Sequence, residues 1–76
     1  MDLVSELEQR WFFYEDEHVW SFELSDWCQI QVELFIGGIH VFVITEFAGD
    51  DKATFVGKYA STLALEYIDR LKELYP

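Results

Sequence analysis

The residues of this 76-residue chain that could do chemistry are one cysteine, two histidines and fifteen carboxylates. A nucleophilic role for Cys28 would require a lowered thiol pKa, which usually comes from a neighbouring base or a helix N-terminus. Cys28 instead precedes a segment rich in acids, and nearby carboxylates raise the pKa of a thiol. It also shares strand parity with Ile30 and Val32, which directs it inward as a small hydrophobic residue. We therefore expect Cys28 to be structural.

The two histidines are not expected to form a metal site. His18 lies in a predicted loop and His40 in a predicted strand, and their spacing matches no familiar zinc site. Asp50-Asp51 lacks the alternating oxygen ligands and the distal glutamate of an EF-hand. The sequence contains no glycine-rich phosphate loop, nucleophile elbow or zinc-protease motif. It predicts a protein that is not an enzyme and that has no catalytic residue, metal or cofactor.

The charge of the chain is the main indication of a binding partner. The formal net charge is −10, and residues 1–33 hold nine acids and one base. Charge far from zero raises solubility, but the field also attracts cationic partners. It repels nucleic acid and anionic membranes alike. The distribution predicts a basic protein as partner, with neither direct nucleic-acid nor membrane binding.

The composition predicts one small globular domain over residues 1–76. Hydrophobic residues make up 51% of the chain and aromatic residues 18%, too many for a disordered acidic tail. One cysteine cannot form an internal disulfide, which is typical of a reducing cytoplasm. The N-terminus has no signal-peptide pattern, and the longest apolar run, Ile39–Thr45, is too short to span a bilayer. We expect a cytoplasmic protein.

The N-terminal half predicts a helix followed by a strand. Leu3, Leu7, Trp11 and Tyr14 recur at helical spacing, which favours a helix from Asp2 to about Tyr14. The polar run Glu15–His18 then predicts a surface loop. Val19–Leu24 alternates as a half-buried strand, with Trp20, Phe22 and Leu24 on one face.

Gly37-Gly38 lies between two runs of strand periodicity and predicts a two-residue hairpin turn with positive φ. This register places six aliphatic residues on one face. The expected pairs are Ile36 with Ile39, Leu34 with Val41, and Val32 with Val43.

The C-terminal third predicts a fourth strand and a second helix. A turn at residues 48–52 precedes the strand, expected over Ala53–Tyr59, and Ser61 or Thr62 could cap the helix. Leu63, Tyr67, Leu71 and Leu74 form an apolar stripe that would cover the sheet. The predicted fold is α+β: an antiparallel four-stranded meander with an N-terminal and a C-terminal helix, in the order α-β-β-β-β-α.

The candidate binding residues are acids and aromatic side chains on the second face of this sheet and in its loops. Carboxylates at alternate strand positions would lie about 7 Å apart, close to the spacing of successive phosphates. The ordinary alternative is a solvated polar face, or a face whose Phe35 and Phe42 the first helix covers. The expected partner-binding residues are Glu15, Asp16, Glu17, Trp20, Glu23, Asp26, Glu33, Phe35, Phe42 and Glu46.

In size, acidity and lack of catalytic motifs, the whole chain resembles small phage-encoded inhibitors of host nucleases, the anti-CRISPR and anti-restriction DNA mimics. The resemblance is to this class, without a diagnostic motif. It implies a nucleic-acid-binding enzyme in a bacterial cytoplasm as target, blocked by DNA mimicry or by occupation of a protein interface. One alternative is an interaction module or a homodimeric antitoxin or immunity partner that uses a patch of Phe35, Phe42 and Ile44. A small enzyme with a carboxylate pair is the last alternative.

Overall fold

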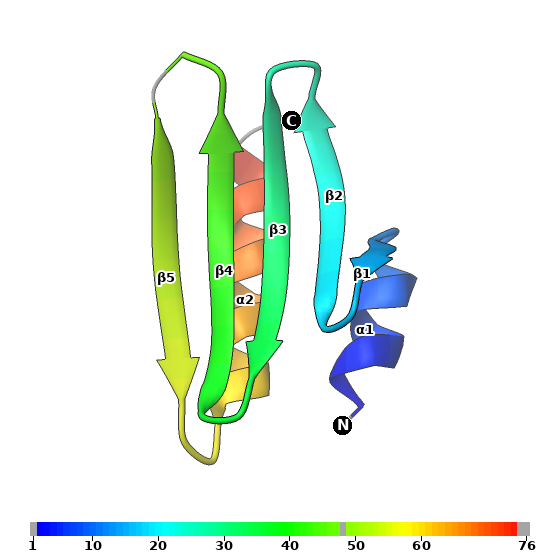
Figure 1. Ribbon diagram of the computed structural model, residues 1–76, viewed down its shortest axis with the longest axis vertical. Helices are drawn as coiled ribbons and strands as arrows, with labels where there is room; N and C mark the ends of the chain where they lie inside the picture. Colours follow the sequence, from blue (N-terminus) through cyan, green and yellow to red (C-terminus); the bar gives the residue numbers. More distant parts are fainter. Residues whose placement is uncertain (1, 48, 75–76) are drawn as a thin grey trace.

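Two helices and one antiparallel sheet make up the fold (Figure 1). It is known from a computed structural model that describes residues 2–47 and 49–74. The five strands pair in sequence order, so the meander is confirmed with one strand more than expected. The elements are α1 (Leu3–Gln9), β1 (Phe13–Asp16), β2 (Val19–Ser25), β3 (Cys28–Phe35), β4 (Gly38–Thr45), β5 (Asp50–Val56) and α2 (Ala60–Leu74).

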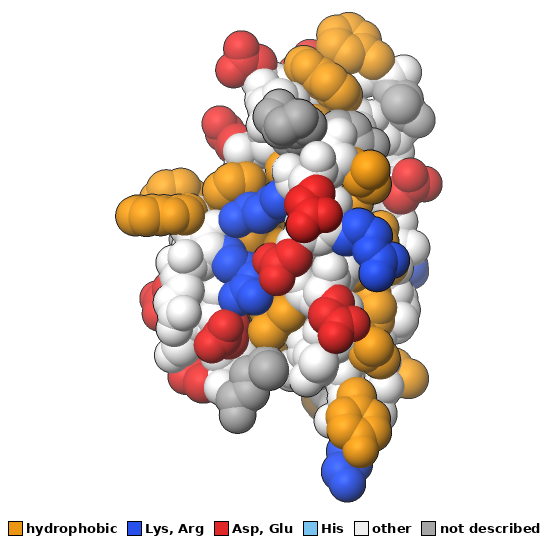
Figure 2. All heavy atoms as spheres, turned by 180° about the vertical axis from the view of Figure 1, so that it is seen from behind, with side chains coloured by type: hydrophobic (Ala, Val, Ile, Leu, Met, Phe, Trp, Pro, Cys, Tyr) orange, Lys and Arg blue, Asp and Glu red, His pale blue; other side chains and the backbone are white. Residues whose placement is uncertain are grey.

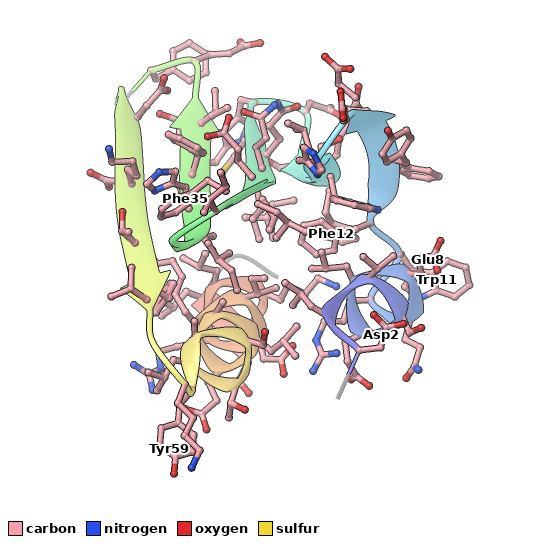
Figure 3. All side chains as sticks on the ribbon, turned by 60° about the horizontal axis from the view of Figure 1, so that its bottom comes forward. Asp2, Glu8, Trp11, Phe12, Phe35 and Tyr59 are labelled. Atoms are coloured by element: carbon pink, nitrogen blue, oxygen red, sulfur yellow. The ribbon has the colours of Figure 1, made fainter. Side chains whose placement is uncertain are left out.

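Both helices lie on the same face of the sheet, and the core lies between the two layers (Figures 1 and 3). The aliphatic residues of the central strands face this layer because side chains alternate along a strand. The other face of the sheet has no helix over it in the described chain. The buried core consists of Leu7, Phe12, Trp20, Cys28, Ile30, Val32, Ile39, Val41, Val43, Ala60, Ala64, Leu65, Ile68 and Leu71.

The central hairpin is confirmed, but its register differs by two residues from the expected one. Leu34 pairs with Ile39, and Phe35 pairs with Gly38, so the two loop residues are Ile36 and Gly37. A shift of two residues preserves which face each side chain occupies, because the side-chain period of a strand is two. The aliphatic face is therefore as expected, except that Ile36 is fully exposed in the turn.

Gly38 belongs to β4 because β5 approaches it too closely for a side chain. A Cβ atom at this position would collide with the carbonyl oxygen of Phe55 on the neighbouring strand. Neither Gly37 nor Gly38 adopts a positive φ, so the expected reason for two glycines here was wrong. The need for glycine at position 38 therefore comes from the neighbouring strand, whereas a Cβ atom at Gly37 would meet only the ring of Phe35.

The first helix is shorter than its hydrophobic spacing predicts. It ends at Gln9, and Trp11 follows with a left-handed φ of 68°. The N–H of Phe12 donates to the carbonyl of Leu7 (3.0 Å), and that of Trp11 donates to Glu8 (3.0 Å). These two bonds form a Schellman motif, which satisfies the last carbonyls of the helix. The chain then enters β1, the additional strand, which contains Phe13 and Tyr14 from the expected helix and Glu15 and Asp16 from the expected loop.

The C-terminal elements also differ in their boundaries. β5 begins at Asp50, three residues before the expected start, and ends before Gly57, whose φ is 92°. α2 begins at Ala60, so neither Ser61 nor Thr62 caps it. Its buried side chains include Leu65 and Ile68, whereas Leu63 and Leu74 are exposed. The buried stripe is rotated because α2 packs against α1 as well as against the sheet.

An ion pair and a partly buried lysine join the two helices. The Arg10 guanidinium donates two hydrogen bonds to the Asp69 carboxylate (2.8 and 3.0 Å), and Lys72 Nζ donates to the Arg10 carbonyl (2.7 Å). Lys72 Nζ also lies 3.9 Å from the centre of the Phe22 ring, a cation–π contact. Burial lowers the pKa of Lys72. Figure 2 shows this side of the molecule, where Lys and Arg side chains lie beside acidic ones.

Asp69→Asn is expected to lower the free energy of unfolding at neutral pH by about 0.5–1 kcal/mol, because the pair is partly exposed. Hydrogen bonds from Arg10 lower the pKa of the Asp69 carboxyl below its ordinary value. The pair therefore contributes above the unfolded-state pKa, and the contribution is lost as pH falls through the folded-state pKa. Urea unfolding from pH 7 to pH 2 measures this. A difference between wild type and variant that persisted undiminished at pH 2 would contradict it.

Candidate protein interface

The sheet separates the predicted acidic residues into two groups at opposite ends. Glu15 and Asp16 lie in β1 and Glu17 in the following turn, while Glu33 pairs with Val19 beside that turn. The other group lies at the far end of the sheet, where the β2–β3 and β4–β5 connections meet (Figure 1). It consists of Glu23, Asp26 and Glu46.

The expected row of carboxylates at phosphate spacing is not formed. Within the described residues, none of β2–β5 carries two acids at alternate positions on the open face. Glu23 and Glu33 share that face, but Glu33 lies opposite Val19, four residues along β2 from Glu23. That separation is about 13 Å along the strand. Uncharged Ser21 and Gln31 lie between them.

The acids at the far end line a hollow of about 280 Å³ together with Trp27. The Trp27 ring lies 6.4 Å from the ring of Phe47, and both side chains are exposed. Carboxylates and aromatic faces both attract cations. This end is chemically suited to a basic side chain, and it brings together Glu23, Asp26 and Glu46 as one group.

The open face carries the predicted aromatic patch, but the patch is largely filled by its own contacts. The Phe35 ring stacks on His40, with 4.2 Å between ring centres, and His40 lies 5.9 Å from Phe42. Phe42 and Ile44 are half-buried, and only Phe35 is exposed. The helices lie on the other side of the sheet, so this face is open and the first helix does not cover Phe35 and Phe42 (Figures 1 and 3).

Trp20 does not belong to an accessible surface. Its side chain is 7% exposed and lies on the helix side of the sheet, opposite Val32. The ring of Tyr14 meets it edge-on, with 5.2 Å between ring centres. Trp20 was expected to contact a partner, but its strand parity places it in the core.

The residues considered for chemistry remain apart. Cys28 is buried, and this burial raises the pKa of its thiol. His40 contacts Thr54 across the sheet (2.9 Å), whereas His18 lies in the β1–β2 turn. Over residues 2–47 and 49–74, no group of three potential ligands could hold a metal ion. No helix in the same residues is long and apolar enough to cross a membrane.

Three strongly exposed aromatic side chains lie in or next to β1, at one edge of the sheet. Trp11, Phe13 and Tyr14 are 76%, 70% and 63% exposed, whereas Phe12 between them is 5% exposed. Trp11 projects away from the body of the molecule (Figure 3). We call Trp11, Phe13 and Tyr14 the aromatic edge. Phe13 pairs with Ser21 and Tyr14 with Trp20, so these two rings lie on opposite faces of the edge strand. Exposed aromatic side chains are frequent anchors of protein interfaces.

Acidic residues follow the aromatic edge along the chain. Ser21 donates a hydrogen bond to Glu15 Oε1 (2.6 Å), and the N–H of Glu17 donates to Asp16 Oδ1 (2.7 Å). These bonds orient the Glu15 and Asp16 carboxylates, which follow Phe13 and Tyr14 directly in the chain. Glu8 adds a further exposed acid at the end of α1 (Figure 3). Aromatic anchors with a charged rim are the usual composition of a binding surface.

The sequence does not predict the aromatic edge, because the spacing of Leu3, Leu7, Trp11 and Tyr14 favours a helix through it. Four consecutive aromatic residues, Trp11–Tyr14, cannot all face one side of a helix, since adjacent positions lie about 100° apart. That run was the available signal that part of this segment is exposed.

No protein-family model matches the sequence, and comparisons with curated proteins and with solved structures find no match.

Proposed function

We propose that this protein is a small acidic inhibitor that binds a basic surface of a nucleic-acid-binding enzyme. The observation that carries the proposal is the aromatic edge, three exposed rings beside Glu15, Asp16 and Glu17. The rings supply contact area, and the acids attract Lys and Arg side chains of the target. Occupation of those cations would displace nucleic acid.

The class that the sequence resembles gives this proposal its biological setting, a host nuclease or CRISPR effector in a bacterial cytoplasm. The arrangement of charge favours occupation of a basic surface over imitation of a DNA strand. The acids form two separate groups, and an uncharged stretch of the open face lies between Glu23 and Glu33. Binding is accordingly anchored by side chains at the sheet edge and steered by charge.

Two double charge reversals test the proposal. We expect Asp16→Lys/Glu17→Lys to weaken target binding at least about tenfold, because both charges lie beside the aromatic edge. Glu66→Lys/Glu73→Lys makes the same change in net charge on exposed positions of α2 and serves as the control. The immobilised protein is incubated with bacterial lysate, and bound proteins are eluted with duplex DNA or with salt.

The proposal is supported if the wild type and the α2 variant both capture a nucleic-acid-binding enzyme that duplex DNA elutes. The β1 variant should not capture that enzyme. If the two variants behave alike, or if DNA fails to compete, the protein does not act through a basic site at this edge.

A further inference from the structure

We propose that a second copy of this chain pairs with β5, joining two sheets into one across a two-fold axis. This inference does not depend on the proposed function. β5 is the edge opposite β1, and within the described chain it pairs only with β4 (Figure 1). It is seven residues long and has a regular register, whereas β1 has four residues and a register shift. Short, bulged, charged edges resist pairing, and long regular edges favour it.

The hydrogen-bond pattern identifies the residues of β5 that are free to pair. The N–H of Glu46 donates to the carbonyl of Trp27, so even-numbered residues of β4 bond to β3. Odd-numbered residues of β4 therefore bond to the odd-numbered residues of β5. The outward N–H and C=O groups belong to Asp50, Lys52, Thr54 and Val56.

One register suits a second copy. When the two-fold axis passes beside Thr54, Thr54 pairs with Thr54 of the second copy. Lys52 then pairs with Val56 of the second copy. On the helix side, Phe55 then faces Ala53. A shift that places the axis at Lys52 sets two like charges opposite each other, which is unfavourable. An axis at Ala53 sets Phe55 against Asp51 of the second copy.

The adjoining side of α2 offers apolar surface that such a neighbour would cover. The Tyr67 ring lies 5.6 Å from that of Phe55, so this side of the helix borders β5. Leu63 and Leu74 lie four residues before and seven residues after Tyr67, on the same side, and both are exposed. Figure 2 shows hydrophobic side chains along this margin, on the right of the view. These residues formed most of the stripe that the sequence predicts to be buried.

The charge distribution indicates that β1 and β5 bind different kinds of partner. Residues 50–76 carry five acids and four bases, whereas residues 1–33 carry nine acids and one base. Self-association at β5 brings together the nearly balanced parts of two chains. Self-association at β1 would instead oppose Glu15 and Asp16 to their own counterparts. A second copy thus suits β5, and a basic partner suits β1.

Light scattering of Thr54→Lys and Thr54→Val tests the proposal. The wild type is expected to show twice the 9.0 kDa mass of one chain. Thr54→Lys sets two cations face to face and should raise the dimer dissociation constant about a hundredfold. Thr54→Val loses the same hydroxyl contact with His40 but adds no charge, so it should remain dimeric. Added salt should strengthen the dimer by screening repulsion between two acidic chains.

A wild type that has the mass of one chain at its highest soluble concentration would overturn the proposal. The same holds if the Lys and Val variants associate equally. Circular dichroism checks that Thr54→Lys is folded. If it is not, Leu63→Glu on the exposed side of α2 replaces it, and a dimer unaffected by that change would place the interface elsewhere.

Discussion

Phe12→Ala is expected to lower the free energy of unfolding by about 3–5 kcal/mol, whereas Phe13→Ala should change it by less than about 0.5 kcal/mol. The two phenylalanines are adjacent, but Phe12 is in the core and Phe13 is exposed. The Phe12 ring lies 5.5 Å from that of Phe22, and it follows the Schellman motif that ends α1. Its loss removes a buried ring that packs against Phe22 where the chain passes from α1 into β1.

Urea unfolding monitored by circular dichroism measures both changes. Marginal stability is usual for a domain of this size, so the Phe12 variant should unfold at a much lower urea concentration than the wild type. Phe13→Ala is the matched control, since it makes the same chemical change one residue away. Equal losses at the two positions would mean that the first helix continues past Gln9 and that β1 is wrongly placed.

Trp11→Gly is expected to have opposite effects on stability and on binding. Trp11 has a left-handed φ of 68°, a conformation that costs most residues about 1–2 kcal/mol and glycine almost nothing. The variant should gain about 0.5–1 kcal/mol in the free energy of unfolding, because glycine is the usual residue at this position of a helix end. Target affinity should fall at least about thirtyfold, or about 2 kcal/mol, since an exposed anchor is removed.

Thermal unfolding and titration against the target recovered from lysate measure the two effects. Phe47→Ser is the control, because Phe47 is similarly exposed but lies after β4, beside Trp27 at the other end of the sheet. Its affinity should match that of the wild type. An unchanged affinity for Trp11→Gly would show that the strained tryptophan has no part in binding, and the aromatic edge would then lose its role as the anchor.

The two proposed interfaces are expected to depend on salt in opposite directions. Binding of a basic target at β1 weakens as salt screens the attraction, and pairing of two acidic chains at β5 strengthens as salt screens the repulsion. Both edges remain free in each complex, because β1 and β5 lie at opposite ends of the strand order. A dimer would therefore present two aromatic edges.

Strand periodicity was sufficient to predict the central sheet. The alternation of Ile30, Val32 and Leu34 with polar residues assigns one face to the core, and a register error of two residues leaves that assignment unchanged. The error arose because the sequence cannot show that Phe55 lies against Gly38. That contact joins two strands, and it determines which glycine belongs to the turn.

The candidate interface was predictable in charge but not in position. The concentration of acids before residue 34 and the group Glu15–Glu17 are properties of the sequence. The exposure of Trp11 and Tyr14 is not, because their spacing from Leu3 and Leu7 fits a helix equally well. Tertiary packing favours a different end of the helix, with Phe12 between α1 and Phe22 and with Lys72 above both rings.

By itself, then, the sequence determined the α+β class, the face of each central strand that is buried and the acidity of the N-terminal half. These depend on side-chain periodicity and on composition, which are local properties. Only the tertiary structure decided where α1 ends, which rings are exposed and which edge of the sheet remains regular. Those features depend on contacts between residues about ten to sixty positions apart, such as Phe12 with Phe22 and Lys72, which local patterns do not encode.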